Sequence, residues 1–374
     1  MSSTEICQTP FGAFSLRRYP ARRNESLLAW CAADLLLLEE INRLGIPGNQ
    51  TLVVNDEHGA LTVALQPQAL WTDSALTALA TQRNLALNQR ADIPVLWSID
   101  KPRHVPALIA LRVPKQLPYF EYQLHVLATL APAGTRVLAA GMDKHLSPRV
   151  AELLERYIGP TERHRGQRKA RLFSATRDQQ NAPPAPSLAR YYCEPLQAEL
   201  TAMPNVFSQE RLDGGSRLLL AQLPGLEPAA TVVDLACGNG VLGLAAYRLG
   251  IARELVFADE SAMALASARA NAASVFPAQG DHFHFYHGDG LAAYPGEAAQ
   301  LIVCNPPFHL NHVVDDYAGK RLLTQCAAHL QPGGRLCLVA NRHLDYVRTL
   351  RRQFDRVDEL ARDDRFIVWL ARRR

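Results

Sequence analysis

The chain has 374 residues, of which 48% are hydrophobic and 20% charged, and its formal net charge is +4. This composition fits a globular protein of about two domains, and neither a membrane span nor the basic and then apolar layout of a signal peptide is found, which predicts a cytoplasmic location. The seven cysteines are scattered without a CxxC pair, so we expect reduced thiols and no metal site.

Arginine is concentrated in four short segments, although the net charge is small. They are SLRRYPARR near the start, ERHRGQRKAR at 162–171, RTLRRQFDR at 348–356 and the terminal ARRR. Arginine pairs bidentately with phosphates and stacks on bases. Any one segment is equally consistent with a solvated helix face, but four of them together favour a nucleic-acid partner bound through a basic surface.

The chain reads as two similar halves separated by a polar, proline-rich linker, DQQNAPPAPS, at 178–187. In the first half TLVVNDEHGAL at 51–61 predicts a strand that runs into a turn and a helix, as TVVDLACGNGVLGL does in the second. LATLAPAGTRVLAAGMDKHL at 127–146 aligns with AAHLQPGGRLCLVANRHLDY at 327–346 at a constant offset, 330 − 130 = 200. Upstream, ALRVPK echoes IVCNPP.

This repetition predicts an α/β fold of two tandem Rossmann-like domains, at 1–180 and 188–374. Only the second keeps a glycine-rich turn after its first strand, with Asp234, Ala236, Gly238 and Gly240 in DLACGNG. Glycines let the backbone approach a ligand closely, and the following helix start favours an anionic group. The first half has NDEHG there, and Val113-Pro114-Lys115-Gln116 in place of NPPF, so a degenerate domain kept for structure or substrate binding is expected.

Three further strand ends follow in the second half. The apolar run ELVFAD ends at Asp259, FHFYHGD ends at Asp289, and LIVC is followed by NPPFH at 305–309. Each acid alone could be a helix cap or a turn residue. Carboxyl ends of parallel strands share one edge of a sheet, where ligands bind in open α/β folds, so the ordered series predicts a single site.

The series resembles the class I methyltransferases that use S-adenosylmethionine and act on a nitrogen conjugated to a ring or a carbonyl. The resemblance implies that the residues of the glycine loop hold the methionine part of this cofactor. It also implies that Asp259 binds the ribose hydroxyls and that Asp289 lies beside the adenine amine, with Asn305 close to the cofactor. No metal is needed for methyl transfer.

The NPPF turn suits an amine whose lone pair is delocalised into a ring. The amide oxygen of Asn305 and the carbonyl of Pro306 can accept both N–H hydrogens and so direct the lone pair at the methyl carbon. Phe308 can stack on the base. Pro307 and His309 are predicted to contact the substrate, and for His309 a structural role and a general-base role both stay open.

NVFSQERLDGGSRLLL at 205–220 resembles the VFS…LD.G segment of the bacterial ribosomal RNA guanine-N2 methyltransferases, whose first domain is also degenerate. NPPFH and VANRHLDY most resemble the branch that acts on 23S RNA. This implies methylation of a guanine N2 in 23S RNA, with Phe207, Ser208 and Asp213 near the cofactor and substrate. Methylation of 16S RNA and a non-catalytic RNA-binding protein are the alternatives; the sequence leaves the oligomeric state and the target guanine open.

Overall fold

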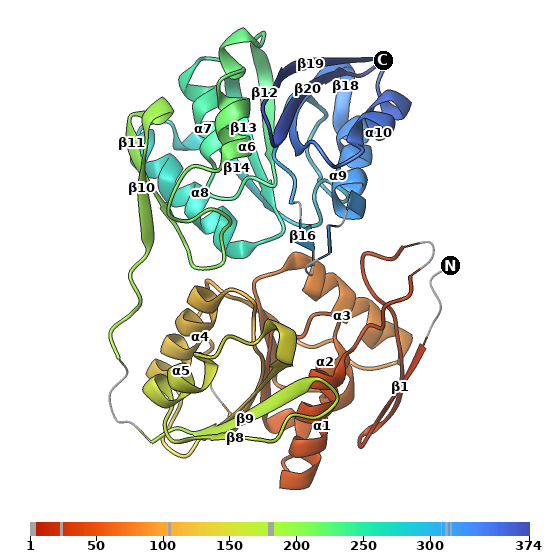
Figure 1. Ribbon diagram of the computed structural model, residues 1–374, viewed down its shortest axis with the longest axis vertical. Coiled ribbons are helices and arrows are strands. Elements are labelled where there is room, and N and C mark those ends of the chain that lie inside the picture. Colours follow the sequence, from red (N-terminus) through yellow and green to blue (C-terminus); the bar gives the residue numbers. More distant parts are fainter. Residues whose placement is uncertain are drawn as a thin grey trace. The chain divides into compact units, whose positions relative to one another are not determined.

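The computed structural model divides the chain into two compact units, residues 1–187 and 188–374 (Figure 1). It describes residues 5–22, 25–103, 106–178, 183–307, 309–310, 313–314 and 316–374, and only the backbone of 309, 310, 313, 314 and 316. Each unit contains one seven-stranded sheet, which agrees with the predicted α/β class. No described helix is long and apolar enough to cross a membrane.

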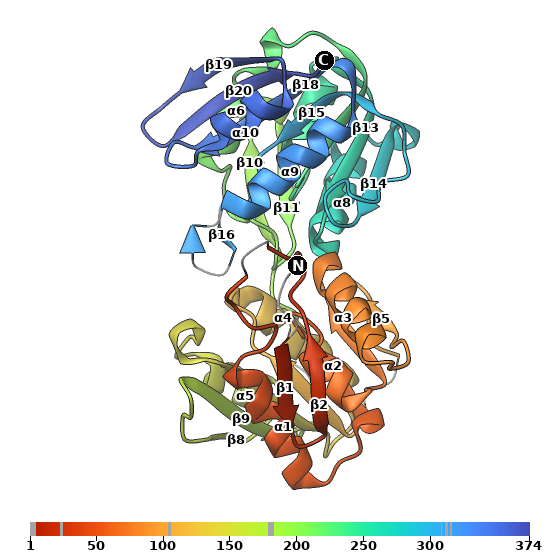
Figure 2. The same ribbon diagram turned by 90° about the vertical axis from the view of Figure 1, so that its right-hand side faces the viewer.

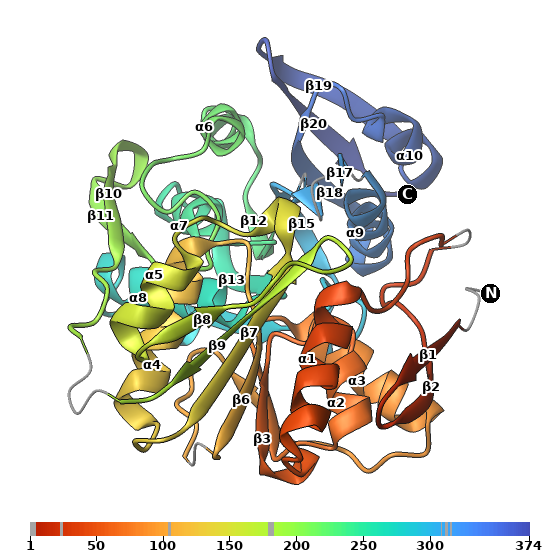
Figure 3. The ribbon, with the colours of Figure 1, turned by 60° about the horizontal axis from the view of Figure 1, so that its bottom comes forward.

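The N-terminal unit begins with a hairpin and continues as a sheet with helices on both faces (Figure 3). Its elements are β1 (Glu5–Thr9), β2 (Gly12–Leu16), α1 (Ala32–Leu44), β3 (Thr51–Val54), α2 (Ala60–Leu65), β4 (Ala69–Thr72), α3 (Ala75–Leu87), β5 (Val95–Trp97), β6 (Leu108–Arg112), α4 (Leu117–Leu130), β7 (Arg136–Met142), α5 (Val150–Tyr157), β8 (Thr161–Arg163) and β9 (Ala170–Thr176).

The C-terminal unit repeats this plan (Figure 2). Its elements are β10 (Ala189–Cys193), β11 (Ala198–Ala202), α6 (Gly214–Leu220), β12 (Ala229–Leu235), α7 (Val241–Arg248), β13 (Ala252–Asp259), α8 (Ala262–Val275), β14 (Phe283–His287), β15 (Ala299–Cys304), β16 (His309–Leu310), β17 (Val313–Val314), α9 (Asp316–His329), β18 (Leu330–Asn341), α10 (Tyr346–Gln353), β19 (Arg356–Arg362) and β20 (Phe366–Arg372).

The two sheets have the same strand order. It is β5-β4-β3-β6-β7-β9-β8 in the first unit and β14-β13-β12-β15-β18-β20-β19 in the second, and in each sheet only the sixth strand of this order, β9 or β20, runs antiparallel to the others. Adjacent residues of the central strands face opposite layers: Val232 packs in the core beneath α6 to α8, and Val233 in the core beneath α9 and α10. The predicted duplication is confirmed at the level of the fold.

The duplication includes a contact that the sequence comparison missed. Asn84 of α3 donates from Nδ2 to the carbonyls of Arg17 and His58, at 2.9 and 2.8 Å, and accepts from the Arg17 N–H. Asn271 of α8 makes the matching bonds to Thr201 and Asn239. In each unit a buried asparagine therefore ties the hairpin segment to the turn after the central strand.

The strand register corrects the predicted alignment of the two halves by one residue. Gly134 and Gly333, at φ 85° and 75°, donate to the matching carbonyls of Arg177 and Arg373, so the offset in this strand is 333 − 134 = 199. The error arose because both Gly333 and Gly334 offer a glycine to align, and only the backbone conformation distinguishes them.

The same register changes the counterpart of Asn305. Leu111 lies opposite Val54 and Ala139, as Cys304 lies opposite Leu235 and Leu338. The residue that follows Leu111 therefore matches Asn305. It is Arg112, and not the predicted Val113, and its guanidinium forms an ion pair with Asp34 at the start of α1.

In the N-terminal unit the side chains of the turn after β3 form hydrogen bonds with residues of neighbouring helices. Asn55, at φ 59°, exchanges amide hydrogen bonds of 2.9 Å with Gln123, and the buried Asp56 carboxylate accepts from the backbone and hydroxyl of Thr62. Glu57 stands where the second unit has Gly238. A bulky, charged side chain thus replaces a glycine, which agrees with the expected loss of ligand binding.

Candidate active site

The glycine loop connects β12 to α7, and three of its residues have a left-handed backbone conformation. Ala236, Gly238 and Gly240 have φ values of 56°, 55° and 84°, and α7 begins directly afterwards at Val241. Glycine adopts this conformation freely, whereas an alanine there costs about 1 kcal/mol. The chain accepts that cost at Ala236, so the departure from glycine noted in the sequence leaves the loop conformation intact.

The glycines of the loop serve different purposes. A Cβ on Gly243 would lie 2.9 Å from Phe257, and one on Gly240 would lie 3.0 Å from the same ring, so both let α7 pack closely on the sheet. A Cβ on Gly238 would meet nothing nearer than Val206 at 3.9 Å. The backbone of Gly238 is therefore the part of the loop open to a ligand.

Asp234 lies fully buried beneath the loop. Its Oδ2 accepts a 2.8 Å hydrogen bond from the Gly243 N–H, which holds the first turn of α7 against β12. Burial raises the pKa of the Asp234 carboxyl to about 8, and the charge of Asp259 adds to the rise. A direct cofactor contact by Asp234 stays a prediction; the contact that the structure records supports the loop.

This burial predicts a pH-dependent stability. The Asp234 carboxyl ionises near pH 3.8 when exposed but keeps its proton to about pH 8 when folded, so its stabilising effect is complete below about pH 4 and is lost as the pH rises towards 8. In wild type the free energy of unfolding should fall between pH 5 and 8, and Asp234→Asn should reduce this fall by about a few kcal/mol. Urea titrations at three pH values test this; a slope equal to wild type would contradict it. Asp56→Asn removes a carboxyl of pKa about 6, so it should reduce only the part of the fall in unfolding free energy that occurs below about pH 6.

Asp259 connects the glycine loop to the next helix. Its Oδ2 accepts from the Gly238 N–H at 3.0 Å and its Oδ1 accepts from the Ser261 N–H at 2.9 Å, where α8 begins. The carboxylate thus lies at the end of β13, at the same edge as the loop. This position is the one that the sequence predicts for a group that binds ribose hydroxyls, and the role itself stays a prediction.

Asp289 lies two residues after β14 and is buried. It forms an ion pair with Arg321 of α9, and Gln325 of the same helix accepts from the Leu291 N–H at 2.9 Å. The acid predicted to lie beside the adenine amine is therefore also bound to α9, and neither contact is visible in the local sequence.

Asn305 follows β15 and has its amide oriented by α6. Nδ2 donates to Oδ2 of Asp213 at 3.0 Å and to Oγ of Ser216 at 2.9 Å. Oδ1 of Asn305 is buried and accepts no hydrogen bond from the residues that the structure describes. A buried acceptor without a partner costs about 1–3 kcal/mol, so this oxygen favours a ligand that donates a hydrogen.

The residues that follow Asn305 are described only in part. Pro306 is buried and Pro307 is exposed. Phe308 lies outside the described residues, and of His309 only the backbone, in β16, is described. Their predicted roles in stacking and substrate contact remain predictions.

The segment before α6 lies beside the glycine loop through Val206, the side chain nearest to Gly238. Phe207, its neighbour, is 66% exposed, which is unusual for a large apolar side chain. Ser208 has φ 54°, and its hydroxyl donates to the Arg211 carbonyl at 2.7 Å. This tight turn presents Phe207 to solvent close to the loop, as the predicted substrate contact requires.

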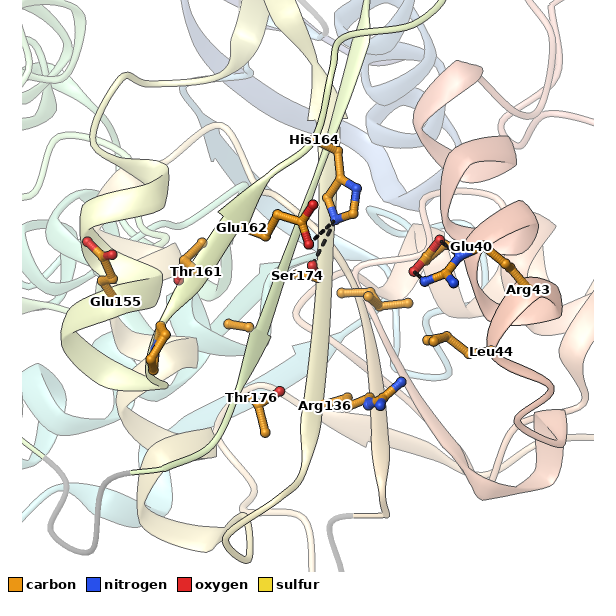
Figure 4. A pocket seen from close by; sticks show the side chains of 13 residues that line it. Glu40, Arg43, Leu44, Arg136, Glu155, Thr161, Glu162, His164, Ser174 and Thr176 are labelled. Atoms are coloured by element: carbon orange, nitrogen blue, oxygen red, sulfur yellow. Dashed lines mark hydrogen bonds and ion pairs between the residues drawn. The ribbon is translucent and has the colours of Figure 1, made fainter.

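A hollow of about 530 Å³ lies in the N-terminal unit, over β7, β8 and β9, and is separate from these strand ends (Figure 4). Within it His164 lies 2.8 Å from the Ser174 hydroxyl and 3.8 Å from Glu162. Both contacts use Nε2, whereas a catalytic triad needs the acid and the serine on opposite ring nitrogens. The arrangement does not favour nucleophilic catalysis.

A mostly parallel sheet with a glycine loop after its central strand, an acid after the next strand and an Asn-Pro-Pro turn after the strand on the other side is the arrangement expected of an S-adenosylmethionine-dependent methyltransferase. The residues present fit that cofactor: the open backbone at Gly238 offers room, and the Asp259 carboxylate lies beside it. We identified no group of three or more potential metal ligands among the residues described.

Comparison with known proteins places the chain within this class. Residues 4–179 match the RLMG N-terminal domain, and residues 197–370 match the methyltransferase small domain. The chain is 41% identical to ribosomal RNA large subunit methyltransferase G of Alcanivorax borkumensis, over 96% of this chain and 95% of that protein, and 40% identical to the protein of the same name in Stutzerimonas stutzeri, over 97% and 98%. The chain belongs to the ribosomal RNA large subunit methyltransferase G family.

A solved structure has the same two-unit fold. The T. thermophilus 16S rRNA N2 G1207 methyltransferase, solved in complex with AdoMet and guanosine, superimposes with a TM-score of 0.76 over 100% of this chain and 98% of that one, at 22% identity. The predicted enzyme class, cofactor and duplicated fold are thus confirmed, and the non-catalytic alternative is not supported by the family.

Proposed function

We propose that this enzyme transfers the methyl group of S-adenosylmethionine to the exocyclic N2 of a guanine in 23S ribosomal RNA, and that it acts in the cytoplasm. The observation that carries the proposal is the Asn305 amide: its NH2 is bound to Asp213 and Ser216, and its buried oxygen is left to accept a hydrogen. The large-subunit substrate follows the names of the relatives.

The chemistry requires a site that changes the nitrogen rather than deprotonating it. The lone pair of a guanine N2 is delocalised into the ring, so the amine is a poor nucleophile. Oδ1 of Asn305 and the backbone carbonyl of Pro306 accept its two hydrogens, which makes the nitrogen more tetrahedral and directs its lone pair. The bound cofactor would supply an electrophilic methyl group and leave as the neutral thioether, and the methylated amine would lose one of its two hydrogens as a proton to solvent. Phe308 would hold the base by stacking.

The test is methyl transfer from labelled S-adenosylmethionine to unmodified 23S and 16S RNA, followed by nucleoside analysis. Label in N2-methylguanosine from 23S RNA alone is expected. Label from 16S RNA alone would keep the reaction and overturn the substrate. If neither free RNA is labelled but isolated large ribosomal particles are, the substrate is the assembled particle. Label in another nucleoside would overturn the proposed atom.

The basic surface proposed to hold the RNA is best supported on α10. Arg348, Arg351 and Arg352 lie on one face of this helix, are exposed, and form no ion pair within the part of the chain that the structure describes. In the segment at 162–171, Arg168 pairs with Glu39 and Arg171 with Asp143, whereas Arg163 and Arg165 are exposed. Because α10 follows β18, it begins at the same edge as Asn305.

Replacing these three arginines by alanine should weaken RNA binding and make its salt dependence shallower. About 0.7 units of slope in log K against log salt are lost per phosphate contact with single-stranded RNA, so a change of about 2 is expected, with cofactor affinity unchanged. A triple alanine variant of three arginines paired with nearby acids, Arg356, Arg362 and Arg374, is the matched control. Equal effects in both variants would assign binding to net charge rather than to α10.

A further inference from the structure

Asp213, the N-cap of α6, and Ser216 within α6 fix the orientation of the Asn305 amide, although they are 92 and 89 residues away in the sequence. A carboxylate has only acceptors, so the group that faces Asp213 must be the NH2 of Asn305. Ser216 accepts the second hydrogen of that NH2. Because both N–H groups are held on one side, the amide oxygen is turned to the other.

The position of Asp213 is itself fixed by the fold. Asp213 is the N-cap of α6, and the oxygen that binds Asn305 also accepts from the Ser216 N–H at 3.0 Å. Gly214 and Gly215 follow, and a Cβ on either would lie 3.1–3.2 Å from the ring of Phe366. Phe366 starts β20 opposite Asn341, so the cap is seated at the edge of the sheet where β15 also ends.

We propose that Asp213 and Ser216 are positioning residues that keep the Asn305 amide from rotating by 180°. This inference rests on the proposed function, in which Asn305 accepts a hydrogen of the guanine amine. A rotated amide would direct its NH2 at that amine, donor against donor, and would bind no substrate hydrogen. Rotation would break both hydrogen bonds to Nδ2 and bring Oδ1 against the Asp213 carboxylate. Without these bonds the amide can also shift from the geometry that methyl transfer needs, and a misplacement of about 1 Å can lower the rate by about 10²-fold.

Asp213→Ala tests the inference, with Ser216→Ala as a second variant. Each should lower kcat by about tenfold or more, while the cofactor Kd and the KM for RNA stay within about twofold. Asp213→Ala also removes a helix cap, so Ser74→Ala, which removes the side-chain cap of α3 in the N-terminal unit, is the control for capping alone and should leave kcat unchanged. Unchanged kcat in Asp213→Ala would overturn the inference.

A double-mutant cycle separates positioning from a general structural effect. If Asp213 acts through Asn305, Asp213→Ala should cost nothing further in an Asn305→Ala background, whereas additive losses would overturn the inference. Asp213→Asn keeps an oxygen that can cap α6 and accept from Asn305, so it should retain most of the activity. A loss as large as that of Asp213→Ala would contradict this.

Charge provides an independent rescue experiment. Asn305→Asp places a second carboxylate against Asp213 and should abolish transfer, and adding Asp213→Asn should restore part of it by removing the repulsion. No gain in the double variant would overturn the proposed contact. Wild-type enzyme without guanine N2 methylation would instead refute the proposed function, so the two failures are distinguishable.

Discussion

Replacing Asn305 by alanine is expected to lower kcat for RNA methylation by about 10²–10³-fold, the usual effect of removing a fixed group that interacts with developing charge. The substrate nitrogen gains positive charge as the methyl group is transferred, so an oxygen bound to its hydrogen interacts more strongly in the transition state than in the bound substrate. The loss should therefore appear in kcat more than in KM.

Steady-state kinetics with labelled cofactor measure this prediction, and titration calorimetry with S-adenosylmethionine serves as its control. The side chain of Asn305 contacts α6 rather than the glycine loop, so cofactor affinity should change little. Thermal unfolding should show a modest effect, because the truncation leaves Asp213 capping α6 through Ser216. An active Asn305→Ala enzyme would refute the mechanism, and a lost cofactor affinity would assign Asn305 to cofactor binding.

The features that the sequence predicts correctly are those encoded in continuous stretches. The strand-turn-helix pattern around Gly238 and Gly240 and the proline stop after Cys304 both depend on neighbours in the chain, and each is found at the expected edge of the sheet. Local patterns of this kind specify where strands end, and in a parallel sheet strand ends meet.

The features that the sequence does not reveal depend on contacts between distant segments. Nothing near Asn305 indicates that Asp213 will bind it, because the approach requires the start of α6 to pack against Phe366 at the start of β20. The ion pair of Asp289 with Arg321 is equally hidden. The one-residue shift that makes Arg112 the counterpart of Asn305 depends on strand register. Packing of the strands determines this register, and the sequence alignment misses it because Gly333 and Gly334 are adjacent glycines.

The degenerate unit differs from the C-terminal unit at the matching strand end. Arg112 brings a guanidinium to the strand end where the active unit has a neutral amide, and Asp34 neutralises it there. A guanidinium has only hydrogen-bond donors, so Arg112 cannot accept a hydrogen from a substrate amine as the amide oxygen of Asn305 can. The fold was kept while several of the predicted ligand-binding positions changed, although Gly59 keeps the glycine and the φ of 84° of Gly240.

Asp259 carries the second large effect, and the degenerate unit supplies its control. Asp259→Ala is expected to raise the cofactor Kd by about 10- to 100-fold, since hydrogen bonds between a carboxylate and ribose hydroxyls contribute about 1.5–3 kcal/mol. It also removes the acceptor for the N–H groups of Gly238 and Ser261, so some of the loss would come from the loop itself.

Asp259→Thr separates these two contributions. The counterpart of Asp259 in the N-terminal unit is Thr72, whose hydroxyl accepts from the Ser74 N–H at 3.3 Å where α3 begins, as Asp259 does for Ser261 at the start of α8. The strand end of this fold therefore accommodates a threonine. The variant should unfold within a few degrees of wild type and still lose cofactor affinity about as much as Asp259→Ala, because the carboxylate is absent from both. A Kd close to wild type in a stable Asp259→Thr enzyme would show that the carboxylate supports the loop and does not bind the ribose.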